Sequence, residues 1–312
     1  MITIFKTGEH GLMTTIPAPE KGCWVSAVAP TREEQIWLEE ELGVVPEFVR
    51  AALDPEETSY IDQDEEKEQV LVIADYPARD PDTVSEIPTF MTLPVGVVLM
   101  KGCIVTIAGE ENEPVTELES GRVKVNTTQK TRILLLLLLT ISQRFILCLR
   151  QIDRLSNQTE ARLYKSMKNR ELLHMLQLDK SLVYFSSSLK ADELTLNRIM
   201  RGKLIPHYTE DTDLLEDVII EFRQAVEMCS NYSELNSRTM DGFSNVISNN
   251  MNDIMKELTV ITLVMSIPNM VYGFYGMNVS DLPFPVTWFP LVLSAVLCIA
   301  VWLYFKHSRT FK

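Results

Sequence analysis

Uncharged oxygen-bearing side chains recur along one side of the apolar stretch 258–278 and of the segment before it. Two series, spaced three and four residues apart, form one stripe: Asn245, Ser248, Asn252, Met255, Thr259, Thr262, Ser266, Asn269, Gly273 and Gly276. Residues at this spacing share one face of a helix. A polar face in an apolar span faces water or other helices, and small residues also line packed membrane helices. The stripe therefore has two interpretations, a water-lined path and a helix–helix contact.

The element that carries this stripe is long enough to cross a bilayer. The stretch 258–278 holds 21 residues without a charge, and about 20 apolar residues span the hydrocarbon core. A second uncharged run, 282–305, follows a short loop. The loop has no Lys or Arg, whereas the tail 306–312 has three, so the positive-inside rule places both termini in the cytoplasm. We expect a multi-pass protein of the cell (plasma or inner) membrane with the lipid bilayer as a partner.

Charge and cysteine content narrow the class of protein. Residues 1–125 hold 25 acidic and 9 basic residues, and the remainder holds 18 and 20. An acidic soluble domain disfavours nucleic acid and attracts cations. The five cysteines form no CxxC pair and the four histidines do not cluster, which indicates free thiols and argues against a structural zinc site. The N-terminus lacks the apolar core of a signal peptide, so we expect a cytoplasmic N-terminal domain.

Residues 1–125 alternate strand and helix signals, which predicts an α/β cytoplasmic domain. Thr31 and Glu34 have the spacing of a capping box at a helix start. An acidic turn is expected between Glu57 and Val70. The predicted strands are runs of β-branched and apolar residues bounded by Gly or Pro: 2–5, 24–29, 70–74, 95–100 and 104–107.

Long helices are predicted after this domain. Residues 127–200 contain no Pro or Gly, which favours a hairpin of two helices packed on the domain. The run 133–141 is apolar, but Arg144 ends it well short of a bilayer thickness, so we expect a buried helix and not a third span. A stalk helix then continues into the first span, over about 100 Å at 1.5 Å per residue. Pro268 is expected to kink it, with Thr262 or Ser266 satisfying the freed carbonyl.

The motif Tyr275-Gly276-Met277-Asn278, at the mouth of the first of two C-terminal spans, resembles the signature of the CorA family of divalent-cation (Mg²⁺/Co²⁺) channels. More degenerate similarity extends over 46–57, 70–73 and the hairpin 93–107. The resemblance implies a funnel-shaped homopentamer with the first span lining the pore. The expected segments are a cytoplasmic domain 1–125, a helical hairpin 126–206, a stalk 207–257, a pore-lining helix 258–278, an external loop 279–285, a second transmembrane helix 286–305 and a basic tail 306–312.

The resemblance also assigns roles in the pore. Asn278 matches the asparagine whose ring selects the hydrated ion, with Tyr275, Gly276 and Met277 completing the filter. An amide oxygen accepts hydrogen bonds from bound water without a charge that traps a divalent ion. Asn278 also suits a left-handed helix C-cap.

Deeper in the pore, Asn252, Leu258 and Asn269 match family positions, and Thr262 and Ser266 lie on the stripe. In some relatives a ring of methionines stands at the position of Ser266. Because this chain departs from that pattern, both Leu258 and Met255 are candidates for the gate residue. Either residue is an apolar constriction that blocks ions by dewetting.

Regulation by cytoplasmic Mg²⁺ is a further implication of the resemblance. Asp217 matches the stalk-helix acid of an inhibitory Mg²⁺ site between subunits, with Asp213 one turn before it. Asp75, Asp62 and Asp64 are candidates for the partner carboxylate from the N-terminal domain. Asp213 and Asp217 also suit an exposed acidic helix start.

We therefore predict a divalent-cation channel, for Mg²⁺ with Co²⁺ or Ni²⁺ as further ions, in which Mg²⁺ is both the transported and the regulatory ion and no catalytic cofactor acts. A zinc transporter of the same family and a non-conducting metal sensor anchored in the membrane are the alternatives. An enzyme is not expected, since the sequence holds no P-loop, GxSxG or HExxH motif.

Overall fold

The computed structural model describes residues 1–8, 11–81, 87–166, 169–201, 204–206, 208–277, 283–284, 286 and 288–307. It divides into an N-terminal unit, Met1–Thr239, and a C-terminal unit, Met240–Lys312. The elements are β1 (Ile2–Thr7), β2 (Met13–Thr15), β3 (Trp24–Val28), α1 (Arg32–Ile36), η1 (Trp37–Glu41), α2 (Pro46–Leu53), β4 (Tyr60–Asp64), β5 (Gln69–Arg79), β6 (Phe90–Leu99), β7 (Ile104–Ala108), α3 (Glu113–Glu119), α4 (Lys130–Ser166), α5 (Asn169–Arg201), η2 (Thr209–Asp211), α6 (Thr212–Tyr275) and α7 (Phe289–His307).

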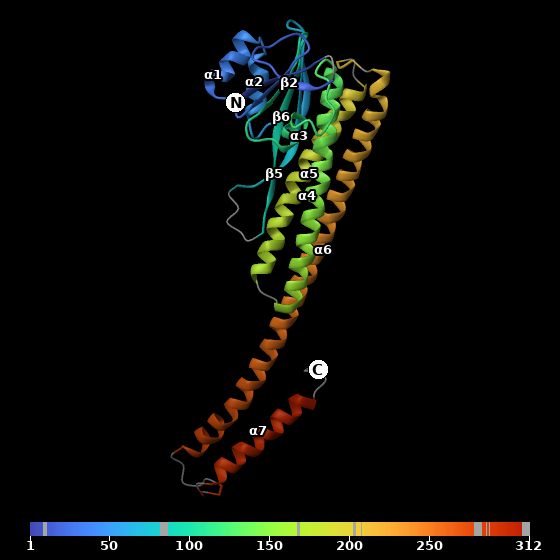
Figure 1. Cartoon of the computed structure of the whole chain (residues 1–312). Coiled ribbons are helices and arrows are strands. Elements are labelled where there is room, and N and C mark those ends of the chain that lie inside the picture. The colour runs from blue at the N-terminus through green and yellow to red at the C-terminus, as the bar shows by residue number, and fades with distance from the viewer. Residues whose placement is uncertain are drawn as a thin grey trace. The chain divides into compact units, whose positions relative to one another are not determined.

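The N-terminal unit is built on a seven-stranded sheet with the order β2-β1-β3-β7-β6-β5-β4 (Figure 1). Only the β3–β7 pair is parallel among the described strands. The capping box of Thr31 and Glu34 forms as predicted. The predicted acidic turn forms at residues 65–68. Asp62 and Asp64, which precede it, belong to the edge strand β4, which is absent from the predicted strands. Its sequence, YIDQD, lacks the apolar alternation that signals a half-buried strand.

Alternate residues of β5 enter two different cores. Val70, Val72 and Tyr76 pack against α4 and α5, whereas Leu71 and Ile73 pack against α2. This follows from the two-residue period of a strand. The sheet is therefore covered on both faces, and its central strands are mostly apolar.

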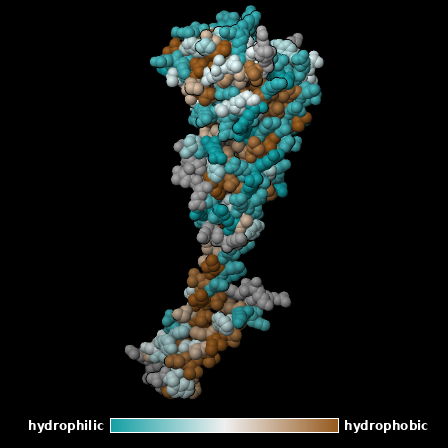
Figure 2. Space-filling model, in the orientation of Figure 1, coloured by the Kyte–Doolittle hydropathy of each residue, from teal (hydrophilic) through white to brown (hydrophobic). Residues whose placement is uncertain are grey.

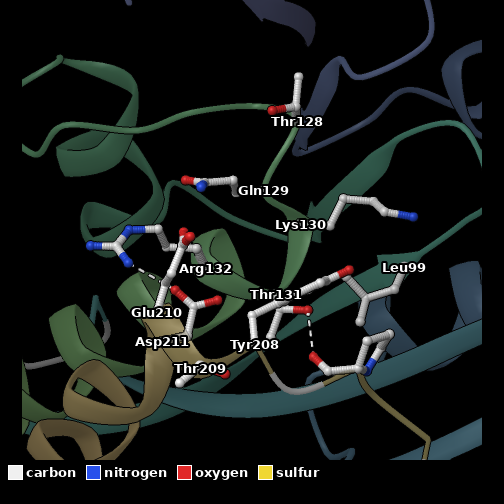
Figure 3. Close-up of a pocket in the computed structure, with 11 residues that line it drawn as sticks. Leu99, Thr128, Gln129, Lys130, Thr131, Arg132, Tyr208, Thr209, Glu210 and Asp211 are labelled. Carbon is white, nitrogen blue, oxygen red and sulfur yellow. Dashed lines mark hydrogen bonds and ion pairs between the residues drawn. The ribbon is translucent and has the colours of Figure 1, made fainter.

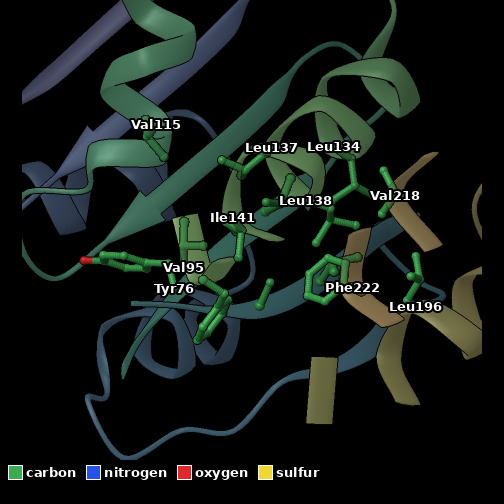
Figure 4. Close-up of a cluster of buried hydrophobic side chains, with 14 of the residues drawn as sticks. Tyr76, Val95, Val115, Leu134, Leu137, Leu138, Ile141, Leu196, Val218 and Phe222 are labelled. Atoms are coloured by element: carbon green, nitrogen blue, oxygen red, sulfur yellow. The ribbon is translucent and has the colours of Figure 1, made fainter. Parts of the chain in front are cut away.

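The leucine-rich start of α4 is the centre of the larger core. Ile133, Leu134, Leu137, Leu138 and Ile141 are buried against the sheet, against α5 and against the first part of α6 (Figure 4). Three helices are long and apolar enough to cross a membrane within the described part of the chain: Lys130–Tyr164, Thr209–Tyr275 and Phe289–His307. The prediction that the run 133–141 is a buried helix is confirmed, since its apolar surface is already covered by protein.

Polar side chains of α5 accept hydrogen bonds from backbone groups of the sheet that no described strand pairs. β4 pairs with β5 only as far as Ile73. Beyond that point, the backbone N–H of Asp75 donates to Asp192 Oδ1 at 3.0 Å. At the start of β6, the N–H of Phe90 donates to Ser181 Oγ at 2.9 Å. Buried backbone groups must be paired, which accounts for polar residues on the buried side of this helix.

The C-terminal unit contains the second half of α6, which runs as one helix from Thr212 to Tyr275, and α7. Figure 2 shows hydrophobic side chains gathered over these two helices, in contrast to the mixed surface of the N-terminal unit. α7 holds no charge before its last turn, where Lys306 and His307 lie. Lys306 Nζ lies 4.8 Å from the ring centroid of Trp302. An aromatic residue beside a basic one at a helix end is typical of a membrane–water interface.

Gly96 fixes how closely α2 approaches the sheet. A Cβ at this position of β6 would lie 2.4 Å from the Cβ of Ala52 in α2. We expect Gly96→Ala to lower the free energy of unfolding by about 1–3 kcal/mol, because the helix must move away from a packed surface. The thermal unfolding midpoint of the full-length protein in detergent measures this. Gly102→Ala is the matched control, since a Cβ there meets nothing within 4 Å, and an equal loss in both variants contradicts the prediction.

Candidate functional site

The polar stripe of α6 is exposed in the single chain. Thr259, Thr262, Ser266 and Asn269 all lie on the surface of the C-terminal unit. The hydroxyl groups of Thr262 and Ser266 donate to backbone carbonyls of the same helix, Thr262 Oγ1 to Leu258 O at 2.8 Å and Ser266 Oγ to Leu263 O at 2.7 Å. Because each hydroxyl proton is used inside the helix, the oxygen presents its lone pairs outward. The stripe therefore offers hydrogen-bond acceptors without charge.

α7 covers the opposite side of α6. Val260, Val264 and Ile267 are partly buried and Val271 is 7% exposed. Their spacing of four, three and four residues makes one face, about half a turn around the helix from the polar stripe at 3.6 residues per turn. The apolar face is thus occupied within the subunit, and the polar face has no partner among the described residues of this unit.

Pro268 removes a backbone donor, and the structure satisfies the freed carbonyl from the other helix. Without an N–H at Pro268, the carbonyl of Val264 has no α-helical partner. Cys298 Sγ of α7 lies 3.4 Å from this oxygen and donates to it. The expectation that Thr262 or Ser266 would do so is wrong, since their hydroxyls bond the carbonyls of Leu258 and Leu263. The sequence shows the missing donor but not which residue of α7 faces it.

α6 ends at Tyr275, the first residue of the signature motif, and Gly276 and Met277 follow it. The N–H of Gly276 donates to Tyr272 O at 2.8 Å, and a Cβ at Gly276 would lie 3.1 Å from the same oxygen. Tyr275 Oη donates to Pro283 O at 2.9 Å. Met277 is 52% exposed, and Asn278 lies outside the described residues. The motif thus begins where the helix stops, and Tyr275 ties this end to the segment leading into α7.

The two candidates for an apolar constriction lie before this polar stretch. Met255 and Leu258 are each 54% exposed, and Asn252 is exposed as well. Leu258 is four residues before Thr262 and three after Met255, so all three lie on one side of a helix. The apolar gate candidates therefore share the face of the polar stripe.

The acids at the start of α6 point away from the core. Val218 and Phe222 are buried against α4 and α5, whereas Asp213 and Asp217 are exposed. Asp62 on the edge strand β4 is exposed and Asp64 is partly exposed. Asp75, by contrast, is only 6% exposed and lies against Asp192 of its own subunit. Its enclosed position does not fit the expectation that it pairs with Asp217 of a neighbouring subunit, so we do not retain it as a ligand.

A cavity of about 520 Å³ lies where α4 and α6 begin (Figure 3). Three of its charged residues already have partners: Arg132 Nη1 lies 2.8 Å from Asp211 Oδ1, and Lys130 Nζ donates to Met100 O at 2.5 Å. Burial lowers the pKa of Lys130. Thr131 Oγ1 donates to Pro206 O at 3.1 Å. These contacts join the starts of the two helices, and no group of three or more His, Cys, Asp or Glu residues in the described chain could hold a metal.

The sequence is similar to proteins of one known family over most of its length. The family model of the CorA-like Mg²⁺ transporter protein matches residues 19–307. The cobalt/magnesium transport protein CorA of Methanocaldococcus jannaschii is 26% identical over 299 residues, covering 91% of this chain and 90% of the relative. That of Thermotoga maritima is 23% identical over 224 residues, covering 69% of this chain and 64% of the relative.

Similarity of fold extends over the whole chain. The complete structure of the CorA magnesium transporter from Methanocaldococcus jannaschii matches with a TM-score of 0.82 at 22% identity, covering 99% of this chain and 98% of that one. An N-terminal α/β unit, long helices and a C-terminal helix are thus the shared architecture. The family model, the sequence relatives and the fold agree, and the chain belongs to the CorA family.

Proposed function

We propose that this protein is a subunit of a channel for hydrated divalent cations, with Mg²⁺ as the principal ion and Co²⁺ or Ni²⁺ as further ions. The observation that carries the proposal is the exposed polar stripe of α6, which lies opposite the apolar face that α7 covers. Both helices are long and apolar enough to span a membrane. A polar stripe on such a helix requires water or protein beside it, because lipid cannot pair its oxygens.

The chemistry of the stripe suits an ion that keeps its water. Mg²⁺ releases its hydration shell reluctantly, so its outer surface consists of water protons seeking acceptors. Thr262 and Ser266 supply such acceptors, because their own protons are bonded within the helix. No described residue from Leu258 to Met277 carries a charge. A divalent ion can therefore pass without being trapped by a carboxylate.

A ring of Asn278, placed just past the end of α6, is the proposed filter, with backbone oxygens of Gly276 and Met277 beside it. Its support is the sequence motif together with the end of the helix at Tyr275. Met255 and Leu258 are the proposed gate, since apolar side chains on the same face narrow and dry the path.

One polar face cannot enclose a path, so the channel requires several copies around an axis. We propose a homopentamer in the cell membrane with both termini in the cytoplasm. Lys306 and His307 at the end of α7 support this orientation, since basic residues favour the cytoplasmic side.

Cytoplasmic Mg²⁺ is the proposed regulator. Asp213 and Asp217 are exposed near the start of the helix whose second half carries the stripe. A cation held between these acids and an exposed acid of a neighbouring subunit, such as Asp62 or Asp64, would bind subunits together while internal Mg²⁺ is high. Loss of the ion leaves like charges that repel each other, so falling internal Mg²⁺ opens the channel.

The filter is tested with Asn278→Ala in liposomes that contain a Mg²⁺-sensitive dye. We expect Mg²⁺ entry under a negative-inside potential to fall to the level of empty liposomes, because the amide oxygens that accept the hydrated ion are lost. Size-exclusion chromatography must show an intact oligomer. If the wild type carries Zn²⁺ but not Mg²⁺, the assignment moves to zinc transport, and if it carries neither ion at any internal Mg²⁺ level, a metal sensor becomes the better assignment.

The water-lined face is tested by cysteine substitution. In Thr262→Cys and Ser266→Cys we expect modification by a membrane-impermeant thiol reagent, whereas Val271→Cys, 7% exposed against α7, should stay unmodified. The wild type, with five native cysteines, sets the baseline for intact-mass measurement. Equal modification at positions 266 and 271 contradicts a water-filled path on the polar face.

The regulatory site is tested with Asp217→Asn. We expect the internal Mg²⁺ concentration for half-inhibition of flux to rise about tenfold, corresponding to a loss of roughly 1.4 kcal/mol of binding. Glu227→Gln on the same helix is a charge-matched control. An unchanged inhibition curve in Asp217→Asn contradicts the role of this acid.

A further inference from the structure

The contact between α5 and the sheet includes two carboxyl groups that the proposed transport does not use. Beyond Ile73, this edge of β5 pairs with no strand among the residues that the structure describes. Ser59 Oγ donates to Ile73 O at 2.8 Å, and the N–H of Asp75 donates to Asp192 Oδ1 at 3.0 Å. Asp192 therefore closes the open edge of the strand on which Asp75 lies.

Both carboxyl groups are enclosed and incompletely paired. Asp75 is 6% exposed and Asp192 is 3% exposed. Asp75 Oδ1 and Asp192 Oδ2 have no hydrogen-bond partner within the described part of the chain. Neither side chain forms an ion pair there. A buried polar atom without a partner costs about 1–3 kcal/mol, and more where the group is charged. The two carboxyl groups therefore lack a hydrogen-bond donor or a positive charge.

The surrounding side chains contribute hydroxyl groups rather than positive charge. Ser59, which precedes β4, and Thr195 of α5 are bonded to each other at 2.9 Å. Ser188 of α5 and Thr92 of β6 are bonded at 2.8 Å. Burial raises the pKa of both carboxyl groups, and the nearby hydroxyls of Ser59 and Ser188 offset this only in part, for Asp192 and Asp75 respectively. Within the described parts of β4, β6, α4 and α5, no Lys, Arg or His lowers the pKa of either carboxyl, and the one charged neighbour of Asp192 is Asp75 itself.

Two adjacent buried carboxylates without a cation cannot both remain ionised at neutral pH. Burial raises the pKa of Asp75 to about 6. Burial and the charge of Asp75 raise the pKa of Asp192 well above its usual range. Two ionised carboxylates offer only acceptors, whereas one bound proton supplies a donor for the oxygens that now lack a partner.

We propose that Asp75 and Asp192 form an internal proton-binding site that fastens α5 to the open edge of β5. The pair holds one proton at neutral pH and takes up a second in mild acid. The site lies within one subunit, it is distinct from the exposed acids of the proposed regulatory site, and it does not depend on ion transport.

The site is linked to the first part of α6 through α5. Cys229 Sγ of α6 donates to Leu182 O of α5 at 3.4 Å, and Asn236 Nδ2 of α6 donates to Asp179 Oδ1 of α5 at 3.1 Å. Proton binding at Asp75 and Asp192 therefore changes how firmly α5 is held, and α5 is the helix that the first part of α6 contacts. Within this unit, acidification is expected to hold α5 more firmly against the sheet.

The direction of the pH effect follows from the raised pKa values. A carboxyl whose pKa is higher in the folded than in the unfolded protein binds protons more tightly when folded. Its contribution to stability is therefore full below the unfolded value and is lost as pH rises through the folded value. For Asp75 this loss falls between about pH 4, near the pKa of an unfolded Asp, and a pH somewhat above 6.

Thermal unfolding of the full-length protein in detergent, between pH 5 and pH 8, tests the site. We expect the difference between the unfolding midpoints at pH 5 and pH 8 to shrink by about 2–4 °C in Asp192→Asn and in Asp75→Asn. Each amide keeps an oxygen acceptor and removes one titrating group. Glu193→Gln is the control, because this partly exposed acid is next to Asp192 on the same helix and its loss should leave the difference unchanged.

Infrared spectroscopy detects the proton directly. The carbonyl stretch of a protonated carboxylic acid is separate from that of a carboxylate, and ¹³C-labelled aspartate assigns it to Asp residues. We expect this band in the wild type and in Glu193→Gln at pH 7, and its loss in the Asp75→Asn/Asp192→Asn double variant. A purely structural role for the two residues would not produce this band.

Two results would overturn the proposal. One is a wild type without the protonated-aspartate band at pH 7. The other is stabilisation of the wild type by Mg²⁺ at pH 7 that disappears in both single variants but not in Asp217→Asn, which would assign a metal ion to the pair. Neither result bears on the liposome assay of transport, so failure of this proposal and failure of the proposed function are distinguishable.

Discussion

A polar stripe on an apolar helix constrains the C-terminal unit. Hydrocarbon offers no partner to the oxygens of Thr262, Ser266 and Asn269, so this face of α6 must meet water or another protein surface. α7 does not supply that surface, because it packs on the valines and Ile267 on the other side. A single copy therefore leaves the stripe unsatisfied in a membrane. The proposed assembly around a shared polar axis would resolve this problem, and it would provide a path for a hydrated ion at the same place.

The pairing of α6 with α7 makes this arrangement possible. Pro268 leaves the carbonyl of Val264 without its helical donor, and Cys298 of α7 fills that role. The carbonyl that Pro268 leaves without a helical donor thus lies on the face that α7 covers and not on the polar stripe. The two faces of α6 consequently have separate tasks: one binds the neighbouring helix, and the other remains available to solvent or to other copies.

The N-terminal unit meets a related requirement at its sheet edge. β4 is short, so one edge of β5 beyond Ile73 has no described strand beside it, and α5 covers this edge with Ser and Asp side chains. Polar groups are buried there because backbone groups need partners, and the cost falls on Asp75 and Asp192, which face each other without a cation. A proton is the smallest species that relieves both the charge and the missing donor.

Much of the fold is predictable from the sequence because periodicity reports which face of an element is buried. The capping box at Thr31, the buried helix over 133–141, the long helix ending near Gly276 and the membership of the CorA family follow from local spacing and from one motif. Strand β4 is missed because three of its five residues, Asp62, Gln63 and Asp64, are polar, and an edge strand needs only one neighbour to form.

The sequence alone does not determine which distant residues lie together in the folded protein. Asp75 is one of many acids in a strongly acidic segment, and only packing shows that α5 encloses it against Asp192, 117 positions away. The role of Cys298 likewise depends on which side of α7 meets Pro268. The sequence by itself determined the helices, the polar stripe and the family, because these depend on neighbours within a few turns. The tertiary structure decided which polar groups are buried together, because that depends on contacts between distant segments.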